Sequence, residues 1–185
     1  TGLGNLYERQ GRLEDARKMA ALLGGEGPRT RPDDDGNGET PVPPPPANGQ
    51  TAVLLRQARL ALKADEHAAA AGYIQPRLKQ FSSGELPTAL HLLGKAQLGM
   101  ASTEQDAERA RRLRLRAGLN LMRVYAGFPD SEQAVESLLL AGRACEQLGN
   151  ESAAKAVYDD ILKRFADTPA AESAREARKR IEEKG

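Results

Sequence analysis

Side chains that commonly catalyse reactions or bind metals are few in this 185-residue sequence. His67 and His91 are the only histidines, and neither has a cysteine, histidine or carboxylate at the spacing of a metal site. The one cysteine, Cys145, is expected to be a small buried hydrophobic residue rather than a nucleophile. The sequence contains no phosphate-binding glycine loop and no serine elbow. We therefore expect a protein that is not an enzyme and that needs no metal or cofactor.

Carboxylates gather at three places, and each has a simpler explanation than acid–base chemistry. The pairs at 159–160 and 182–183 lie in stretches that alternate in sign with arginine and lysine, as a solvated helix face does. Residues 33–38, DDDGNG, match the first six positions of a calcium loop. The twelfth position, where a bidentate glutamate belongs, is Pro44. Calcium binding by this segment is left open, and a spacer is the favoured interpretation.

An arginine-rich stretch raises the possibility of an anionic partner. Arg109, Arg112, Arg116 and Arg123 fall on one stripe of a predicted helix, which we call the basic stripe. Such a stripe can hold phosphates or an acidic protein, but no aromatic residue interleaves with it to stack on bases. Long arginine stems that cover a helix flank are the third explanation. We expect no nucleic-acid partner.

Composition and the placement of prolines and capping residues predict an all-α protein. The formal net charge is +1 and aromatic residues make up 4%, so a core must form mainly from alanine and leucine. Residues 24–50 hold seven of the eleven prolines and almost no apolar residue, which predicts a mobile linker, with a PxxP ligand as the alternative. Elsewhere, apolar residues recur at helical spacing and no strand pattern is found. Ser102-x-x-Gln105 and Thr168-Pro169 are predicted to begin helices.

Two further features bear on membranes and completeness. No run of about 18 apolar residues is present, so no membrane span is expected. The chain begins Thr1-Gly2-Leu3 without a methionine, inside a helical pattern, and we interpret it as a fragment.

The C-terminal half contains two segments of similar sequence. FPDSEQAVES begins at Phe128 and FADTPAAESA begins at Phe165, thirty-seven residues later. The apolar residues before each phenylalanine also match at this shift, as with Leu121 and Tyr158. Gly142 is expected to let the paired helices approach closely, and Gly149 to end a helix in the left-handed conformation. The period predicts a repeated unit of two helices and a turn.

These residues resemble the tetratricopeptide repeat, with its L-G-x-x-Y, G, A and aromatic positions. The stretch GLGNLYERQGRLEDARKMAALL at 2–23 matches at Leu3, Gly4, Tyr7, Gly11 and Ala16, and HLLGKAQLG at 91–99 matches at Leu93 and Gly94. The resemblance implies antiparallel helix pairs stacked in a short right-handed solenoid. It divides the chain into a helix pair at 1–23, the linker at 24–50 and a helical array with a capping helix at 51–185. Gly94 and Gly142 lie forty-eight residues apart, and we expect the extra eleven to lengthen the helix around 103–127.

The same resemblance implies a non-catalytic scaffold that binds a peptide or helix of a protein partner in a concave groove. By alignment, the groove residues are Asn5, Glu8, Arg9, His91, Lys95, Glu136, Leu139, Arg143, Glu146 and Gln147. The FPDS turn also resembles bacterial envelope members of this class, in Tol–Pal-associated and outer-membrane assembly proteins, which favours the periplasm. The alternative is a structural subunit packed permanently in a larger chain or complex. An enzyme would need a pocket that holds a histidine beside a carboxylate with a perturbed pKa. The sequence leaves the oligomeric state open.

Overall fold

The computed structural model describes residues 49–183, in which helices are joined by short turns and loops and no strand occurs, so the all-α expectation is confirmed for this part. The predicted helix pair at 1–23 and the linker residues before 49, with the acidic loop at 33–38, lie outside the described residues. The helices are α2 (Gln50–Lys63), α3 (His67–Ile74), the 3₁₀ helix η1 (Gln75–Gln80), α4 (Leu86–Thr103), α5 (Ala107–Gly127), α6 (Ala134–Gln147), α7 (Glu151–Arg164) and α8 (Pro169–Glu182).

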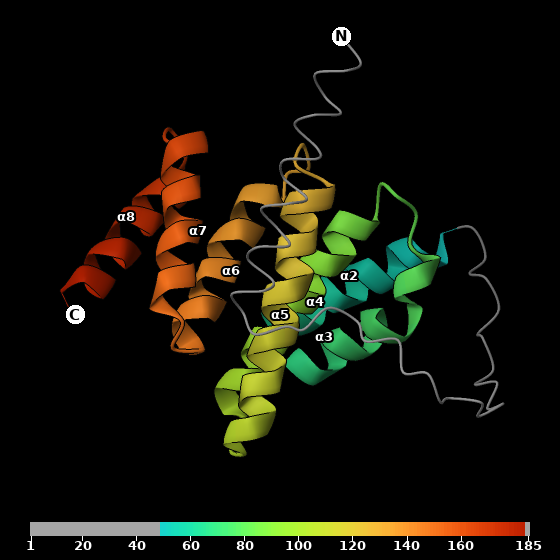
Figure 1. The fold of residues 1–185 in the computed structure, drawn as a ribbon. Coiled ribbons are helices and arrows are strands. Elements are labelled where there is room, and N and C mark those ends of the chain that lie inside the picture. Colours follow the sequence, from blue (N-terminus) through green and yellow to red (C-terminus); the bar gives the residue numbers. More distant parts are fainter. Residues whose placement is uncertain (1–48, 184–185) are drawn as a thin grey trace, which may run out of the picture.

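The helices pack in the order of the sequence. Each α-helix from α2 to α7 packs against the next one, and α2 also contacts α4, α4 contacts α6 and α6 contacts α8. In Figure 1 the row runs from α2 and α3 at one side to α7 and α8 at the other. The buried apolar residues form one cluster in α2–α4 and a larger one in α5–α8. The even-numbered helices therefore form a connected set along the row.

The two phenylalanine turns have the same backbone hydrogen bonds. The amides of Phe128 and Phe165 each donate to the carbonyl oxygen four residues earlier, at 2.9 and 2.8 Å. Three residues further on, the amides of Ser131 and Thr168 donate to the phenylalanine carbonyls, at 3.0 and 3.1 Å. Thr168 is the N-cap of α8 as predicted, although its hydroxyl donates back to the Phe165 carbonyl oxygen and does not cap the helix. Equivalent sequence positions thus make equivalent turns.

Close helix approach also occurs at matching places. A Cβ atom on Gly142 would lie 2.5 Å from Cε1 of Tyr158, and one on Gly94 would lie 2.6 Å from Cγ of Leu121. Tyr158 and Leu121 are the pair that match at the thirty-seven-residue shift. The expected role of Gly142 is confirmed, because any side chain at this position would overlap the tyrosine ring that packs against it from α7.

Gly149 ends α6 as predicted, with a φ angle of 73°. Its amide donates to the Glu146 carbonyl oxygen at 2.9 Å, and the next amide donates to the Cys145 carbonyl oxygen at 2.9 Å, which together make a Schellman motif. The turn after α2 has the same two bonds, and there Asp65 takes the left-handed position at φ 57°. Aspartate tolerates this conformation better than most residues, because its short polar side chain bonds locally.

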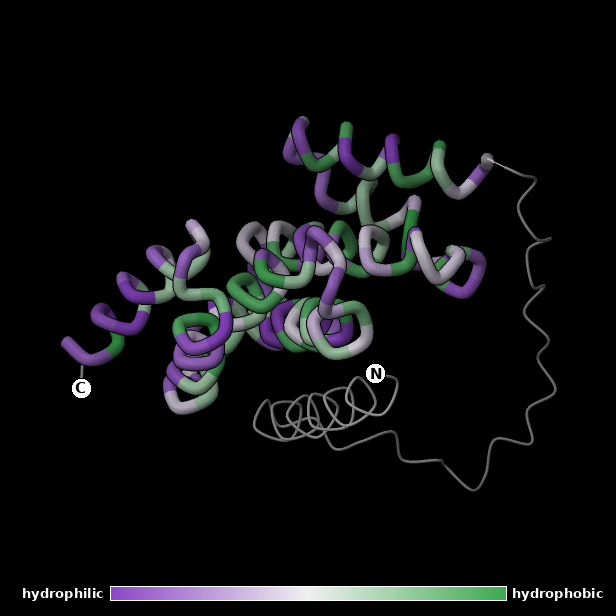
Figure 2. Tube along the Cα trace, turned by 90° about the horizontal axis from the view of Figure 1, so that it is seen from above, coloured by the Kyte–Doolittle hydropathy of each residue, from purple (hydrophilic) through white to green (hydrophobic). Residues whose placement is uncertain are grey.

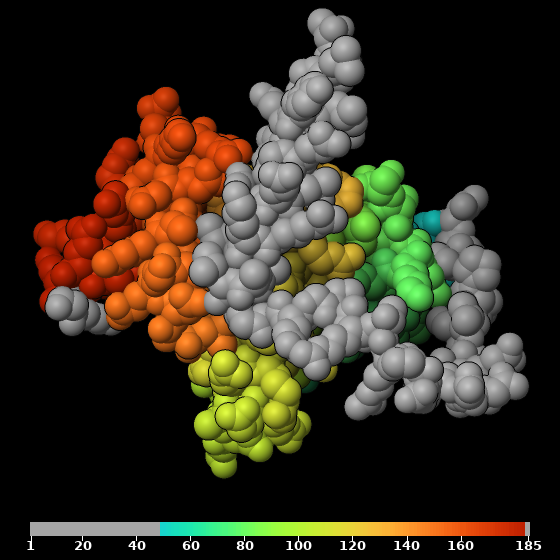
Figure 3. All heavy atoms as spheres, viewed as in Figure 1, coloured from blue at the N-terminus to red at the C-terminus, as the bar shows by residue number. Residues whose placement is uncertain are grey.

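The eleven residues by which the Gly94–Gly142 spacing exceeds thirty-seven are shared between two helices. The helix α4 has 18 residues against 14 in α6, and α5 has 21 against 14 in α7, so four residues extend α4 and seven extend α5. Four and seven residues are close to one and two helical turns, so the packing faces keep their direction. In Figure 3 the joined ends of α4 and α5 project beyond their neighbours as the yellow-green lobe. The prediction placed the whole extension in the second helix and is wrong by these four residues.

The predicted capping box at Ser102 is also wrong. Ser102 lies in the last turn of α4, and its hydroxyl donates to the Gly99 carbonyl oxygen at 2.7 Å. The N-cap of α5 is Asp106, whose carboxylate accepts the Arg109 amide at 2.9 Å. The favourable pattern at Ser102 fails because the hydroxyl has a carbonyl partner in its own helix.

Candidate functional site

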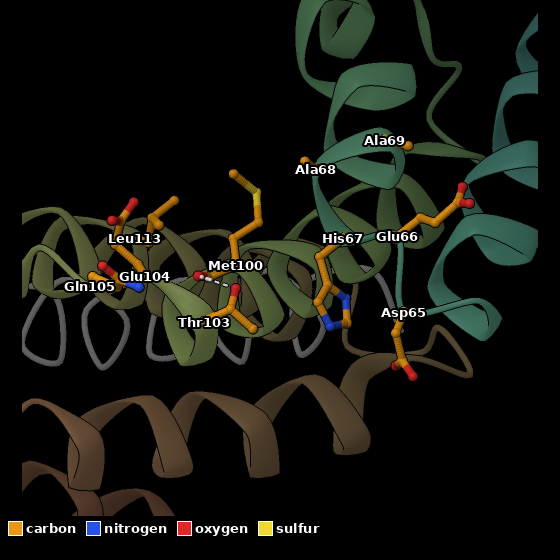
Figure 4. A pocket seen from close by; sticks show the side chains of 10 residues that line it. All are labelled: Asp65, Glu66, His67, Ala68, Ala69, Met100, Thr103, Glu104, Gln105 and Leu113. Carbon is orange, nitrogen blue, oxygen red and sulfur yellow. Dashed lines mark hydrogen bonds between the residues drawn. The ribbon is translucent and has the colours of Figure 1, made fainter.

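A hollow of about 780 Å³ lies where the α2–α3 turn meets the projecting ends of α4 and α5 (Figure 4). The His67 ring packs against Gly99, where a Cβ atom would lie 2.4 Å from the ring. Its Nδ1 atom is buried and has no hydrogen-bond partner in the described part of the chain. The carboxylates of Asp65, Glu66 and Glu104 point in different directions, away from the ring. Residues 49–183 also contain no group of three potential metal ligands. His67 therefore acts here as a packing residue.

The other candidates for chemistry are held in structural contacts. Cys145 is 2% exposed, and burial raises the pKa of its thiol to about 11, so it stays protonated at neutral pH. Asp159 pairs with Arg178 of α8 at 2.8 Å, and Asp160 accepts the Tyr125 hydroxyl at 2.6 Å. The expected burial of Cys145 is confirmed, and the carboxylates at 159–160 join helices to one another.

The basic stripe lies exposed along α5. Arg109 pairs with Glu104 at 3.4 Å, whereas Arg112, Arg116 and Arg123 form no ion pair within residues 49–183. The experiments below use the stripe as a second cationic surface, so that the effect of local geometry can be separated from the effect of charge alone.

The structure brings three predicted groove residues together between α4 and α6. Lys95 donates from Nζ to Oε1 of Glu136 at 3.0 Å, and His91 Nε2 lies 3.5 Å from Oε2 of the same carboxylate. The other ring nitrogen of His91, Nδ1, lies 2.8 Å from Oγ of Ser137. His91 is 5% exposed and Ser137 is fully buried, so this bond lies beneath the surface pair. The sequence analysis did not identify Ser137.

A second polar contact joins α6 to α8. Glu146 accepts the hydroxyl of Tyr158, and its other oxygen lies 3.9 Å from Nη2 of Arg180. Arg143 and Gln147 are exposed on the same helix, whereas Leu139 is only 8% exposed and belongs to the core. We use the name even-helix face for six exposed or half-buried polar residues on α4, α6 and α8, namely Lys95, Glu136, Arg143, Glu146, Gln147 and Arg180. Of the predicted groove set, Asn5, Glu8 and Arg9 lie outside the described residues.

No family model, curated protein or solved structure matches this chain. Within residues 49–183, no helix combines the length and the hydropathy that a bilayer span requires.

The buried histidine and its carboxylate shift one another's titration. Burial is the main cause that lowers the pKa of His91, with Lys95 acting in the same direction and Glu136 against it. For Glu136, burial alone would raise the pKa, but the Lys95 hydrogen bond and the nearby positive charges outweigh it and lower the pKa. Neutral His91 therefore bridges the two helices at physiological pH.

Replacement of His91 by asparagine is expected to reduce the acid sensitivity of the fold between pH 7 and pH 5. The folded-state pKa of His91 lies below its unfolded value of about 6.5, so protons bind preferentially to the unfolded chain as the pH falls below that value. The wild-type free energy of unfolding should then fall by at most about 1.4 kcal/mol per pH unit from this residue. Urea denaturation at several pH values measures the slope. An unchanged slope in His91→Asn would contradict the assignment.

Proposed function

We propose that this chain is a non-catalytic protein-interaction module of the tetratricopeptide-repeat type. In this proposal the helix pairs stack as a right-handed solenoid, and the even-numbered helices line a groove that holds a peptide or helix of a partner. The matching glycine contacts at Gly94 and Gly142 support the repeat, and so do the matching phenylalanine turns. The similarity of the FPDS turn to bacterial envelope members extends the proposal to a cell-envelope assembly.

The observation that carries the function is the arrangement of the even-helix face. Successive even-numbered helices touch one another and present exposed side chains of both signs and an amide. Two carboxylates of this face are held in place by buried side chains, because Glu136 contacts His91 and Glu146 contacts Tyr158. A fixed row of donors and acceptors suits an extended peptide or a helix better than it suits a reaction.

Selection of peptides from a random library by the full chain tests the proposal. Selected peptides should slow amide hydrogen exchange in α4 and α6. The double variant Glu136→Lys, Arg143→Glu should weaken the binding of these peptides by about tenfold or more. The control is Arg112→Glu, Arg116→Glu on the basic stripe, a larger change of net charge that should nevertheless leave binding unchanged if the even-helix face is the site. Protection confined to α3, α5 and α7, or equal losses in both variants, would overturn the groove assignment.

A structural subunit is the second candidate, and one observation favours it. Val53 and Leu60, seven residues apart on α2, are 52% and 55% exposed. Apolar side chains on one helix face are typical of a surface that another chain covers. Light scattering of the full chain after size-exclusion chromatography separates the candidates, because a stable assembly favours the subunit and a monomer favours the transient groove.

A further inference from the structure

A second hollow, of about 430 Å³, lies between α2 and α4, next to the even-helix face. Its lining combines two kinds of side chain, leucines and cations. The leucines are Leu60, Leu62 and Leu92, and the cations are Arg56, Arg59, Lys63 and Lys95. Lys95 also contacts Glu136, so this hollow continues the row of polar groups that the proposed function uses.

The charge around the hollow is one-sided. The residues that line it include four cations and no aspartate or glutamate. Arg56, Arg59 and Lys63 form no ion pair with any residue in 49–183. Arginines at the other end of the row do pair, as Arg178 does with Asp159 and Glu182. Lys95 has Glu136 as its counter-charge, whereas the three cations of α2 have none within residues 49–183 and create a positive potential that attracts acidic groups.

The apolar lining makes a phosphate or nucleic acid a poor occupant. Of the lining leucines, Leu60 is 55% exposed and Leu92 is 7% exposed. Figure 2 shows α2, which follows the grey trace, alternating between hydrophobic and hydrophilic residues from turn to turn. The lining residues include no aromatic side chain for base stacking. A partner that uses both features must carry acidic and apolar residues at helical spacing.

We propose that the hollow between α2 and α4 anchors an acidic, amphipathic segment of a protein partner. The segment places an apolar side chain against the exposed leucine and pairs its carboxylates with Arg56, Arg59 and Lys63. These cations lie three and four residues apart on α2, so acidic residues at the same spacing on a partner helix meet them in register. The inference rests on the proposed function and names its partner class.

The test uses a fluorescein-labelled amphipathic peptide of about 14 residues, or four helical turns, with glutamate flanking a leucine stripe. The full chain should bind it with an affinity that falls as salt rises, and should bind a lysine-for-glutamate version of the peptide at least about tenfold more weakly. Arg59→Glu, Lys63→Glu should weaken binding by about tenfold or more, and Leu60→Ser should weaken it without loss of helicity. The control Arg112→Glu, Arg116→Glu makes the same charge change on α5 and should have less than about a twofold effect.

Several results would overturn the inference. Equal losses in the α2 and α5 variants would mean that net charge, and not the hollow, attracts the peptide. If Leu60→Ser dissociates a dimer or lowers the melting temperature of the free chain, the chain itself covers the hollow. If library peptides bind at α4 and α6 while the acidic peptide does not bind, the proposed function survives and this inference fails. If no peptide of either kind binds, both fail.

Discussion

Truncation of Tyr158 to alanine should lower the free energy of unfolding by roughly 3–5 kcal/mol, the usual cost of removing a fully buried aromatic ring. Within residues 49–183, Tyr158 is the largest side chain that is buried completely, and it fills the space against Gly142 between α6 and α7. The cavity left behind cannot collapse easily, because α6 and α7 are joined by a tight Schellman turn at Gly149. Urea denaturation of the full chain, followed by circular dichroism, measures the loss.

Tyr158→Phe separates the ring from its hydroxyl. Burial raises the pKa of Tyr158, so the group stays protonated and donates to Glu146. Removal of the hydroxyl leaves Glu146 near Arg180 and should cost only about 0.5–1.5 kcal/mol. Tyr73→Ala, at a half-buried position in α3, is the control for loss of a tyrosine ring and should cost less than Tyr158→Ala. A cost for Tyr158→Phe as large as that for Tyr158→Ala would show that the hydrogen bond, and not ring packing, holds the pair.

Local features of the fold could be predicted from the sequence because their causes lie within a few residues or on the next helix of the same pair. The role of Gly149 follows from the need for a positive φ angle at a helix end, and that of Gly142 from the volume of the ring opposite. The cap of α5 was misassigned because Ser102 and the observed N-cap, Asp106, lie only four residues apart and both residue types commonly cap helices. Only the three-dimensional path of α4 shows that Ser102 is still inside the helix.

The polar contacts between α4 and α6 could be predicted from the sequence only in part. The resemblance to the repeat family predicted Lys95 and Glu136 as groove residues, and their side chains meet in the structure. The pattern did not reveal that His91 is buried, because its burial depends on Ser137 in a helix more than forty residues away. The hollow at α2 and α4 was missed although its signal is readable: Arg56, Arg59 and Lys63 share one helix that has no acidic residue. Distances between helices set which charges find partners, and these distances are not encoded in any single segment.

Alanine at Gly142 and alanine at Gly72 should have opposite effects on stability. Both glycines lie inside helices, where alanine alone favours helix formation by about 1 kcal/mol. A Cβ atom on Gly72 would meet nothing within 4 Å, so Gly72→Ala should stabilise the fold by roughly 0.5–1 kcal/mol. A Cβ atom on Gly142 would overlap the Tyr158 ring, and Gly142→Ala should destabilise it by roughly 1–2 kcal/mol after the helix gain is subtracted. Chemical denaturation of the three proteins gives both signs.

The double variant Gly142→Ala, Tyr158→Ala shows whether the ring is the cause. Once the ring is gone, the new methyl group enters empty space, so the Gly142→Ala penalty should disappear and the two changes should couple by about 1 kcal/mol or more. Gly94→Ala should cost less than Gly142→Ala, since the flexible end of Leu121 can turn away from the new methyl group more easily than a buried ring. Strict additivity of the Gly142 and Tyr158 changes would mean that the close approach of α6 and α7 does not depend on this contact. The pairing of Gly94 with Leu121 and of Gly142 with Tyr158 would then no longer support the proposed repeat.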